Sequence, residues 1–211
     1  MPPDFSLLIP FVVAVLLVEL TPGPNMGYLV VVSTRFGRVA GLATVVGVTA
    51  GLTVYLLAAV FGLGEVLLRV GWLYGLLRWA GVAYLLWLAW DTWRDDGLDA
   101  EGRNEPPPSR ARLMGRGFLA NVLNPKAAVF YVALLPGFTD PHRVFAPQAL
   151  GLGLIHIAIS VVIHLTLVLA AARAAPLVTA DHPDGRKAIR AAFALALAAI
   201  AVWLAWSTRR G

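Results

Sequence analysis

Long apolar runs separated by short polar segments follow one another along the whole chain. A run of about 20 apolar residues is the length that an α-helix needs to cross the hydrocarbon core of a bilayer. The pattern therefore predicts an all-α membrane protein with six transmembrane helices. The predicted spans cover approximately residues 6–33, 39–63, 71–93, 117–135, 149–171 and 188–206.

The first span is interrupted near its middle by the sequence Thr-Pro-Gly-Pro-Asn at residues 21–25. Pro22, Gly23 and Pro24 break a helix, and in hydrocarbon each backbone group left unpaired costs several kcal/mol unless another partner satisfies it. A continuous helix over the span would be roughly 42 Å long, whereas the hydrocarbon core is about 30 Å thick. An acidic residue, Glu19, lies directly before the break, and intramembrane carboxylates are rare and usually functional. We therefore expect an unwound segment with a role in function.

The fourth span contains a second interruption, the sequence Asn-Val-Leu-Asn-Pro-Lys at residues 121–126. Pro125 breaks the helix there, and Lys126 places a cation beside the break. The first and fourth helices are thus predicted to be broken at Pro-Gly-Pro and at Asn-Pro.

The chain is predicted to be a single transmembrane transporter domain over residues 1–211. It consists of two similar halves, and each half begins with a broken helix. Repeat 1 covers about residues 1–93, a polar cytoplasmic linker covers 94–115, and repeat 2 covers about 116–211. Because each half has an odd number of spans, the halves are predicted to be inverted relative to each other. Inverted repeats with discontinuous helices in matching positions indicate a transporter with a binding site at the membrane midplane.

The charges at the two breaks suit a small zwitterion. Glu19 can attract an ammonium group, whereas Lys126 and the N-terminus of a half-helix can attract a carboxylate. The alternative is that Glu19 and Lys126 form an internal ion pair, with Asn25 and Asn124 only capping the half-helices. The predicted substrate-binding residues are Glu19, Thr21, Asn25, Asn121, Asn124 and Lys126.

The fifth span carries His156 and His164 with Ser160 between them, at a spacing that places all three near one helix face. Histidine titrates near neutral pH and recurs in intramembrane proton relays. Glu19, His156 and His164 are therefore the candidates for proton coupling. The alternative is a neutral histidine that donates to a neighbouring carbonyl group.

Composition and charge agree with this interpretation. The chain is 59% hydrophobic and 14% charged, and it has no cysteine, which excludes disulfides and thiol chemistry. Eleven of its arginines and lysines lie in or beside the loops after the first, third and fifth spans, and four lie on the other side. The positive-inside rule therefore predicts a multi-pass protein of a bacterial cytoplasmic (inner) membrane with both termini outside. The chain has no nucleotide-binding motif, and we expect no enzyme activity, no cofactor, no metal and no nucleic-acid partner.

Several segments resemble the lysine exporter (LysE/RhtB) family. They are the Thr-Pro-Gly-Pro-Asn sequence with the glycines that follow it, residues 81–88 in the third span, and residues 117–127 around the second break. The resemblance covers about residues 15–137. It implies proton-driven efflux of amino acids or their derivatives, often by a dimer. Most members of the family carry an apolar residue where Glu19 stands, so Glu19 departs from the family's pattern.

Small residues at four-residue spacing, Gly47 and Gly51, lie in the second span. Such a stripe lets helix backbones approach closely. We expect it to pack against another helix of the same molecule, and a homodimer interface is the alternative.

Two other functions are the alternatives: a metal-cation exporter on the same scaffold, and a membrane assembly factor that transports nothing. A metal-cation exporter would need several intramembrane acidic or histidine residues at one point, whereas Glu19 and the histidines could lie on different faces. A membrane assembly factor would not need the charged breaks at all.

Overall fold

A computed structural model describes residues 5–21, 23–62, 108–140 and 142–178, together with scattered positions between 76 and 93 and between 191 and 202. All regular secondary structure in these described parts is helical. Most of the predicted third and sixth spans, the predicted linker up to residue 107, and Pro22 lie outside the described residues. The predicted count of six spans therefore stays a prediction.

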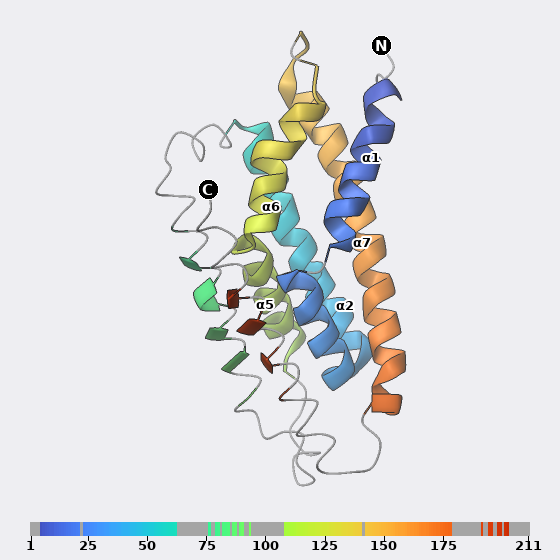
Figure 1. Cartoon of the computed structure of the whole chain (residues 1–211), viewed down its shortest axis with the longest axis vertical. Coiled ribbons are helices and arrows are strands. Elements are labelled where there is room, and N and C mark those ends of the chain that lie inside the picture. Colours follow the sequence, from blue (N-terminus) through green and yellow to red (C-terminus); the bar gives the residue numbers. More distant parts are fainter. Residues whose placement is uncertain are drawn as a thin grey trace.

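The helices form an elongated bundle in which all of them run roughly along the long axis (Figure 1). In chain order they are α1 (Phe5–Leu20), α2 (Pro24–Val60), α5 (Arg110–Val122), α6 (Pro125–Val129), the π-helix η2 (Phe130–Leu134), the 3₁₀-helix η3 (Leu135–Phe138) and α7 (Phe145–Val178).

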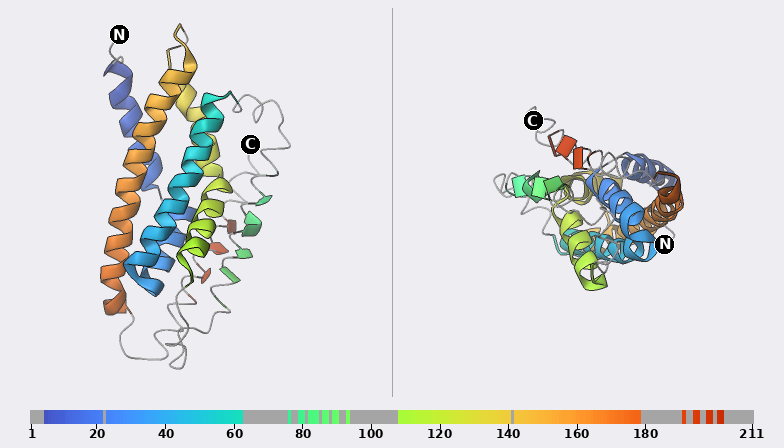
Figure 2. Two further views of the ribbon diagram at one scale, coloured as in Figure 1. Left: turned by 180° about the vertical axis from the view of Figure 1, so that it is seen from behind. Right: turned by 90° about the horizontal axis from the view of Figure 1, so that it is seen from below.

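The first break separates α1 from α2. α1 runs from one end of the bundle to its middle, and the first part of α2 continues to the opposite end (Figure 1). At Gly37 the chain turns back, and the rest of α2 runs the length of the bundle (Figure 2). Gly37 has φ 80° and ψ −179°, a conformation that only glycine adopts without strain. The path agrees with the predicted spans over residues 6–33 and 39–63.

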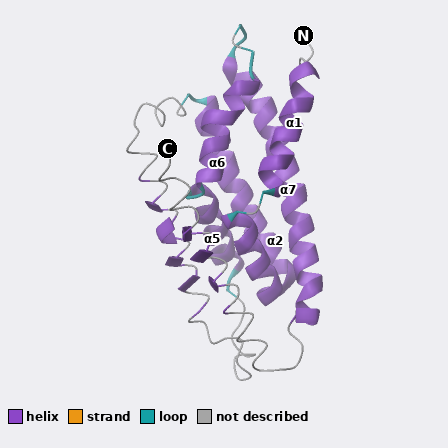
Figure 3. Ribbon diagram, in the orientation of Figure 1, coloured by secondary structure: helices purple, strands orange, loops and turns teal. Residues whose placement is uncertain are grey.

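The second break separates α5 from α6. α5 ends at Val122, α6 begins at Pro125, and η2 and η3 extend the same path to the far end of the bundle. Figure 3 shows both interruptions as short loops about half-way along the molecule. α1 and the α5–α6 path therefore run in opposite directions. The break that ends α1 and the break between α5 and α6 both lie near the middle of the bundle.

The start of α5 corrects the predicted boundary of the linker. Residues 110–115 belong to α5 rather than to a polar linker that ends at 115. Ser109 caps the helix, because its hydroxyl accepts a hydrogen bond from the backbone N–H of Arg112 at 3.3 Å. The hydropathy pattern missed this turn because Arg110 and Arg112 are polar, although a helix can continue beyond the hydrocarbon core.

Two described helices, α2 and α7, are long and apolar enough to cross a membrane by length and composition. The apolar part of α1, Leu7–Leu20, is shorter, because the first break ends it. α7 extends beyond the predicted fifth span at both ends.

Close packing of α2 against α5 depends on glycine. A Cβ atom on Gly47 would collide with the backbone carbonyl of Met114, and one on Gly51 would lie 2.8 Å from Cβ of Asn121. Both contacts are within one molecule, which confirms the predicted intramolecular packing of this stripe.

The exposure of the side chains is the reverse of that in a water-soluble protein. Large apolar side chains are exposed on the outside, for example Ile9, Leu17 and Val162. Polar and ionisable side chains are buried inside, as expected when the surrounding solvent is lipid. Among the residues that the structure describes, the buried polar ones are Glu19, Asn25, Ser33, Thr44, Asn121, Asn124, His156, Ser160 and His164.

Candidate functional site

The Asn-Pro pair explains how the second break forms. The Asn124 side chain accepts a hydrogen bond from the backbone N–H of Lys126 at 3.0 Å, and Pro125 occupies the first helical position, where no N–H is needed. In a continuous helix Lys126 N–H would instead donate to the carbonyl of Val122. That carbonyl accepts from the hydroxyl of Tyr55 at 2.6 Å. A side chain of α2 therefore satisfies the backbone group that the break leaves free.

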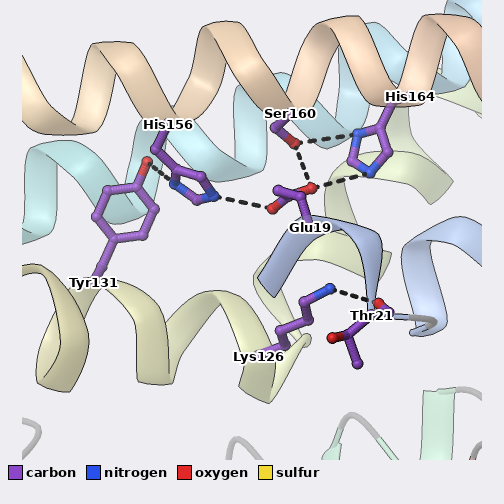
Figure 4. Close-up of polar contacts among 7 residues, drawn as sticks. All are labelled: Glu19, Thr21, Lys126, Tyr131, His156, Ser160 and His164. Atoms are coloured by element: carbon purple, nitrogen blue, oxygen red, sulfur yellow. Dashed lines mark hydrogen bonds and ion pairs between the residues drawn. The ribbon is translucent and has the colours of Figure 1, made fainter. Parts of the chain in front are cut away.

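Lys126 likewise satisfies a backbone group that the first break leaves free. Its Nζ donates to the backbone carbonyl of Thr21 at 2.9 Å (Figure 4), a carbonyl that would pair with Asn25 N–H in a continuous helix. The Thr21 hydroxyl donates back to the carbonyl of Leu17 at 2.7 Å. The two breaks are thus joined directly.

Glu19 is held by one face of α7. Its Oε1 lies 3.0 Å from Nε2 of His156, and its Oε2 accepts from the hydroxyl of Ser160 at 3.1 Å (Figure 4). Nε2 of His164 lies 3.7 Å from the same Oε2. His156, Ser160 and His164 are all buried, and they share one face because they are four residues apart. The predicted polar stripe is present and is directed at Glu19.

A second set of contacts fixes the ring of His156. Its Nδ1 lies 3.1 Å from the hydroxyl of Tyr131, and its ring packs against Phe130 with the ring centroids 3.8 Å apart. Tyr131 stacks in turn on Tyr55, with an interplanar angle of 8°. Tyr131 was not among the predicted site residues, because it lies in an apolar run and nothing in the pattern shows that η2 turns its hydroxyl towards α7.

A small cavity lies between the two breaks. The space open to the centre of a water-sized sphere is about 20 Å³, enough for about one or two water molecules. It is lined by Val18, Glu19, Gly23, Asn25, Met26, Leu52, Asn121, Asn124, Lys126, Ala127, Phe130, His156, Ser160 and His164.

Two amides at this cavity have buried atoms without partners. They are Oδ1 of Asn25 and both Oδ1 and Nδ2 of Asn121. An unsatisfied buried polar group costs about 1–3 kcal/mol, and native structures contain few of them unless water or a ligand is missing. The unpaired amides therefore make this cavity a candidate site for a polar group.

The predicted site residues divide as follows. Glu19, Asn25, Asn121, Asn124 and Lys126 all line the cavity, as do both histidines, whereas Thr21 does not.

The structure also distinguishes between the alternatives predicted for Glu19, Lys126 and the two asparagines. The ion pair between Glu19 and Lys126 is not formed in the described structure, because Lys126 binds the Thr21 carbonyl and Glu19 binds α7. Asn124 is a helix cap as the alternative predicted, but Asn25 is not, because Gly23 occupies the cap position of α2.

The idea that Glu19 and the histidines lie on different faces is wrong, since both histidines converge on its carboxylate. The polar side-chain atoms of Glu19 and the two histidines contact one another and the hydroxyl groups of Ser160 and Tyr131. Within the described ranges there is no group of three or more His, Cys, Asp or Glu residues that could hold a metal ion.

Comparison with protein-family models matches residues 16–208 to the family described as LysE type translocator. The chain belongs to the LysE family. LysE family proteins are membrane transporters rather than enzymes, which confirms the resemblance seen in the sequence motifs and disfavours a membrane assembly factor.

Several relatives of this LysE family protein have names that describe efflux. It is 32% identical over 177 residues to the homoserine/homoserine lactone efflux protein of Salmonella typhimurium, covering 84% of this chain and 85% of the relative. It is 27% identical over 117 residues to the threonine efflux protein of Escherichia coli, covering 53% and 56%. An uncharacterised membrane protein of Vibrio cholerae is 29% identical over 160 residues, covering 76% and 78%. No solved structure matches the chain.

Proposed function

We propose that this chain exports amino acids or amino-acid derivatives across the bacterial cytoplasmic membrane in exchange for protons. The substrate binds in the cavity between the two helix breaks. The observation that carries the proposal is Asn121, a fully buried residue that lines this cavity and whose amide has neither of its polar atoms paired. Family membership and the efflux relatives point to the same substrate class.

The chemistry of the cavity suits an amino acid. Lys126 and the N-terminus of α2, at Gly23 and Asn25, provide positive potential for a carboxylate or a carbonyl oxygen. The amide of Asn121 both donates and accepts, so it can bind either end of the substrate. On the opposite wall Glu19 provides a carboxylate for an ammonium group.

The cavity is too small for an amino acid in the conformation described. About 20 Å³ of space open to the centre of a water-sized sphere holds water but no substrate. Export therefore requires the helices around the breaks to separate. In our proposal two inverted three-helix repeats rock against each other, which fits the opposite directions of α1 and the α5–α6 path (Figure 1).

The proposed topology has six spans with both termini outside. It rests on the excess of arginine and lysine in the loops after the first, third and fifth spans. Single cysteines at positions 2 and 211, introduced into this cysteine-free chain, should react with an impermeant thiol reagent in intact cells. Protection of both positions would contradict the assignment.

A toxicity-rescue screen tests the proposed function. Cells that lack their own amino-acid exporters and produce this chain should grow in an excess of at least one of homoserine, threonine and leucine, the substrates in the relatives' names. The matched control is the Asn121→Leu variant at equal membrane abundance, which should give no protection. Equal sensitivity of producing and non-producing cells to all three compounds would contradict the proposal.

A further inference from the structure

We propose that Glu19 is the exchange site of the antiport, whose carboxylate holds either a proton shared with His164 or the ammonium group of the substrate, but not both. This inference rests on the proposed function, since it states how export and proton entry are coupled. An antiporter requires that its two ligands exclude each other, and the geometry around Glu19 provides one group for which both compete.

The contacts of Ser160 and His164 indicate where the proton can be held. Ser160 donates its hydroxyl proton to Oε2 of Glu19, so its lone pairs face Nδ1 of His164, 3.4 Å away. This second contact is a hydrogen bond when Nδ1 carries a proton. Nε2 of the same ring lies 3.7 Å from the carboxylate, and the two groups attract each other when Nε2 carries a proton as well.

A neutral imidazole carries only one N–H. With both ring nitrogens protonated, the arrangement holds one proton more than a neutral His164 and an ionised Glu19 supply together. In our proposal that proton is held between the Glu19 carboxylate and the imidazole of His164.

Both oxygens of Glu19 are already occupied. Oε1 binds His156, and Oε2 binds Ser160 and faces His164. The ammonium group of a substrate can reach this carboxylate only by displacing donors from α7.

The groups around Glu19 also oppose the presence of two cations. The titratable groups that face this region are Lys126 on α6, Tyr131 on η2 through His156, and the two histidines on α7. No second carboxylate faces Glu19 from the described helices. A substrate ammonium beside an imidazolium and Lys126 would place three cations around one anion, so ammonium binding expels the proton of His164.

The unpaired amides provide an independent sign that a ligand enters next to Glu19. Oδ1 of Asn25 and the whole amide of Asn121 line the same cavity without partners. They suit the carbonyl end of a molecule whose other end is a primary ammonium group. The predicted ligand class is therefore an α-amino acid, or an ester or lactone of one, with a free amine.

Proton release on binding tests the exchange directly. The full-length protein in detergent is titrated with L-homoserine by calorimetry in buffers of different ionisation enthalpy, between roughly pH 5.5 and 8.5, where histidine titrates. We expect the wild type to release close to one proton per L-homoserine at the pH of maximum release. Below that pH its affinity should fall about tenfold per pH unit.

Two variants and a matched control complete the test. Glu19→Gln and His164→Asn should each release no proton and show an affinity for L-homoserine that does not depend on pH, and either variant suffices if the other fails to fold. Asp140→Asn also removes one carboxylate, from an exposed ion pair with Arg143, and should behave as the wild type. N-acetylated homoserine, which lacks the ammonium group, should release no proton from any form.

The two possible failures differ. If the wild type binds L-homoserine without releasing a proton, or if Glu19→Gln releases as many protons as the wild type, Glu19 is not the exchange site, whereas the proposal that the chain exports amino acids still stands. If the wild type binds none of homoserine, threonine and leucine, the proposed function and this inference are both overturned.

Discussion

Replacing Lys126 by methionine removes the contact that joins the two breaks. Methionine has nearly the length of lysine but neither its charge nor its N–H donors. The backbone carbonyl of Thr21, which now accepts from Lys126 Nζ at 2.9 Å, loses its partner. A hydrogen bond that involves a charged group contributes about 1.5–3 kcal/mol. We expect the free energy of unfolding to fall by about this amount.

Lys126→Met should also weaken transport, because it removes the same charged hydrogen-bond donor. If Lys126 binds the carboxylate or carbonyl oxygen of the substrate, losing a charge-assisted hydrogen bond of about 1.5–3 kcal/mol lowers affinity by about 10- to 150-fold. The assay is export of labelled L-homoserine, with L-threonine and L-leucine in parallel, from cells in which the variant and the wild type are equally abundant in the membrane.

Two control variants separate the possible causes. Lys126→Arg keeps a cation and N–H donors, so it should retain more export than Lys126→Met. Arg143→Met removes a cation from an exposed ion pair and should leave export unchanged. Export at the wild-type rate by Lys126→Met would remove Lys126 from the binding site.

Three further changes give distinct results. Asn121→Leu should reduce export at least tenfold, since it removes an amide that has no partner in the described structure; export at the wild-type rate would remove Asn121 from the binding site. Gly47→Ala, whose Cβ would meet the Met114 carbonyl, should destabilise the protein by about 1–3 kcal/mol, whereas Gly115→Ala, with nothing within 4 Å of its Cβ in helix α5, should be neutral or slightly stabilising in the same thermal unfolding assay. Gly37→Ala should cost about 1–3 kcal/mol, because φ 80° with ψ −179° is a backbone conformation almost restricted to glycine, and unchanged thermal stability would contradict the strain argument.

The positions of the breaks could be predicted because they depend on local chemistry. Pro24 and Pro125 lack a backbone N–H, and Asn124 is a strong helix cap, so each signal lies within a few residues of the structure it creates. The stripe of His156 and His164 was predictable for a similar reason, since a spacing of eight residues stays on one helix face.

The partners of these residues could not be predicted, because they depend on which helices pack together. Charge alone allowed an ion pair between Glu19 and Lys126 as an alternative to substrate binding. In the folded chain α7 supplies hydrogen-bond donors to the carboxylate, and the lysine finds a backbone carbonyl instead. Tyr131 was missed because a π-helix sets its direction, and Asn121 could be named as polar but not as unpaired.

Uptake of labelled amino acid into proteoliposomes that contain the purified chain tests the central claim most directly. With an acidic interior, an exchange of substrate for protons should accumulate L-homoserine, L-threonine or L-leucine well above the level in protein-free liposomes. Asn121→Leu should stay at the protein-free level, and abolishing the pH gradient should abolish accumulation by the wild type. Failure of the wild type to accumulate any of the three, or equal accumulation by Asn121→Leu, would contradict a proton-coupled exporter whose substrate binds between the two breaks.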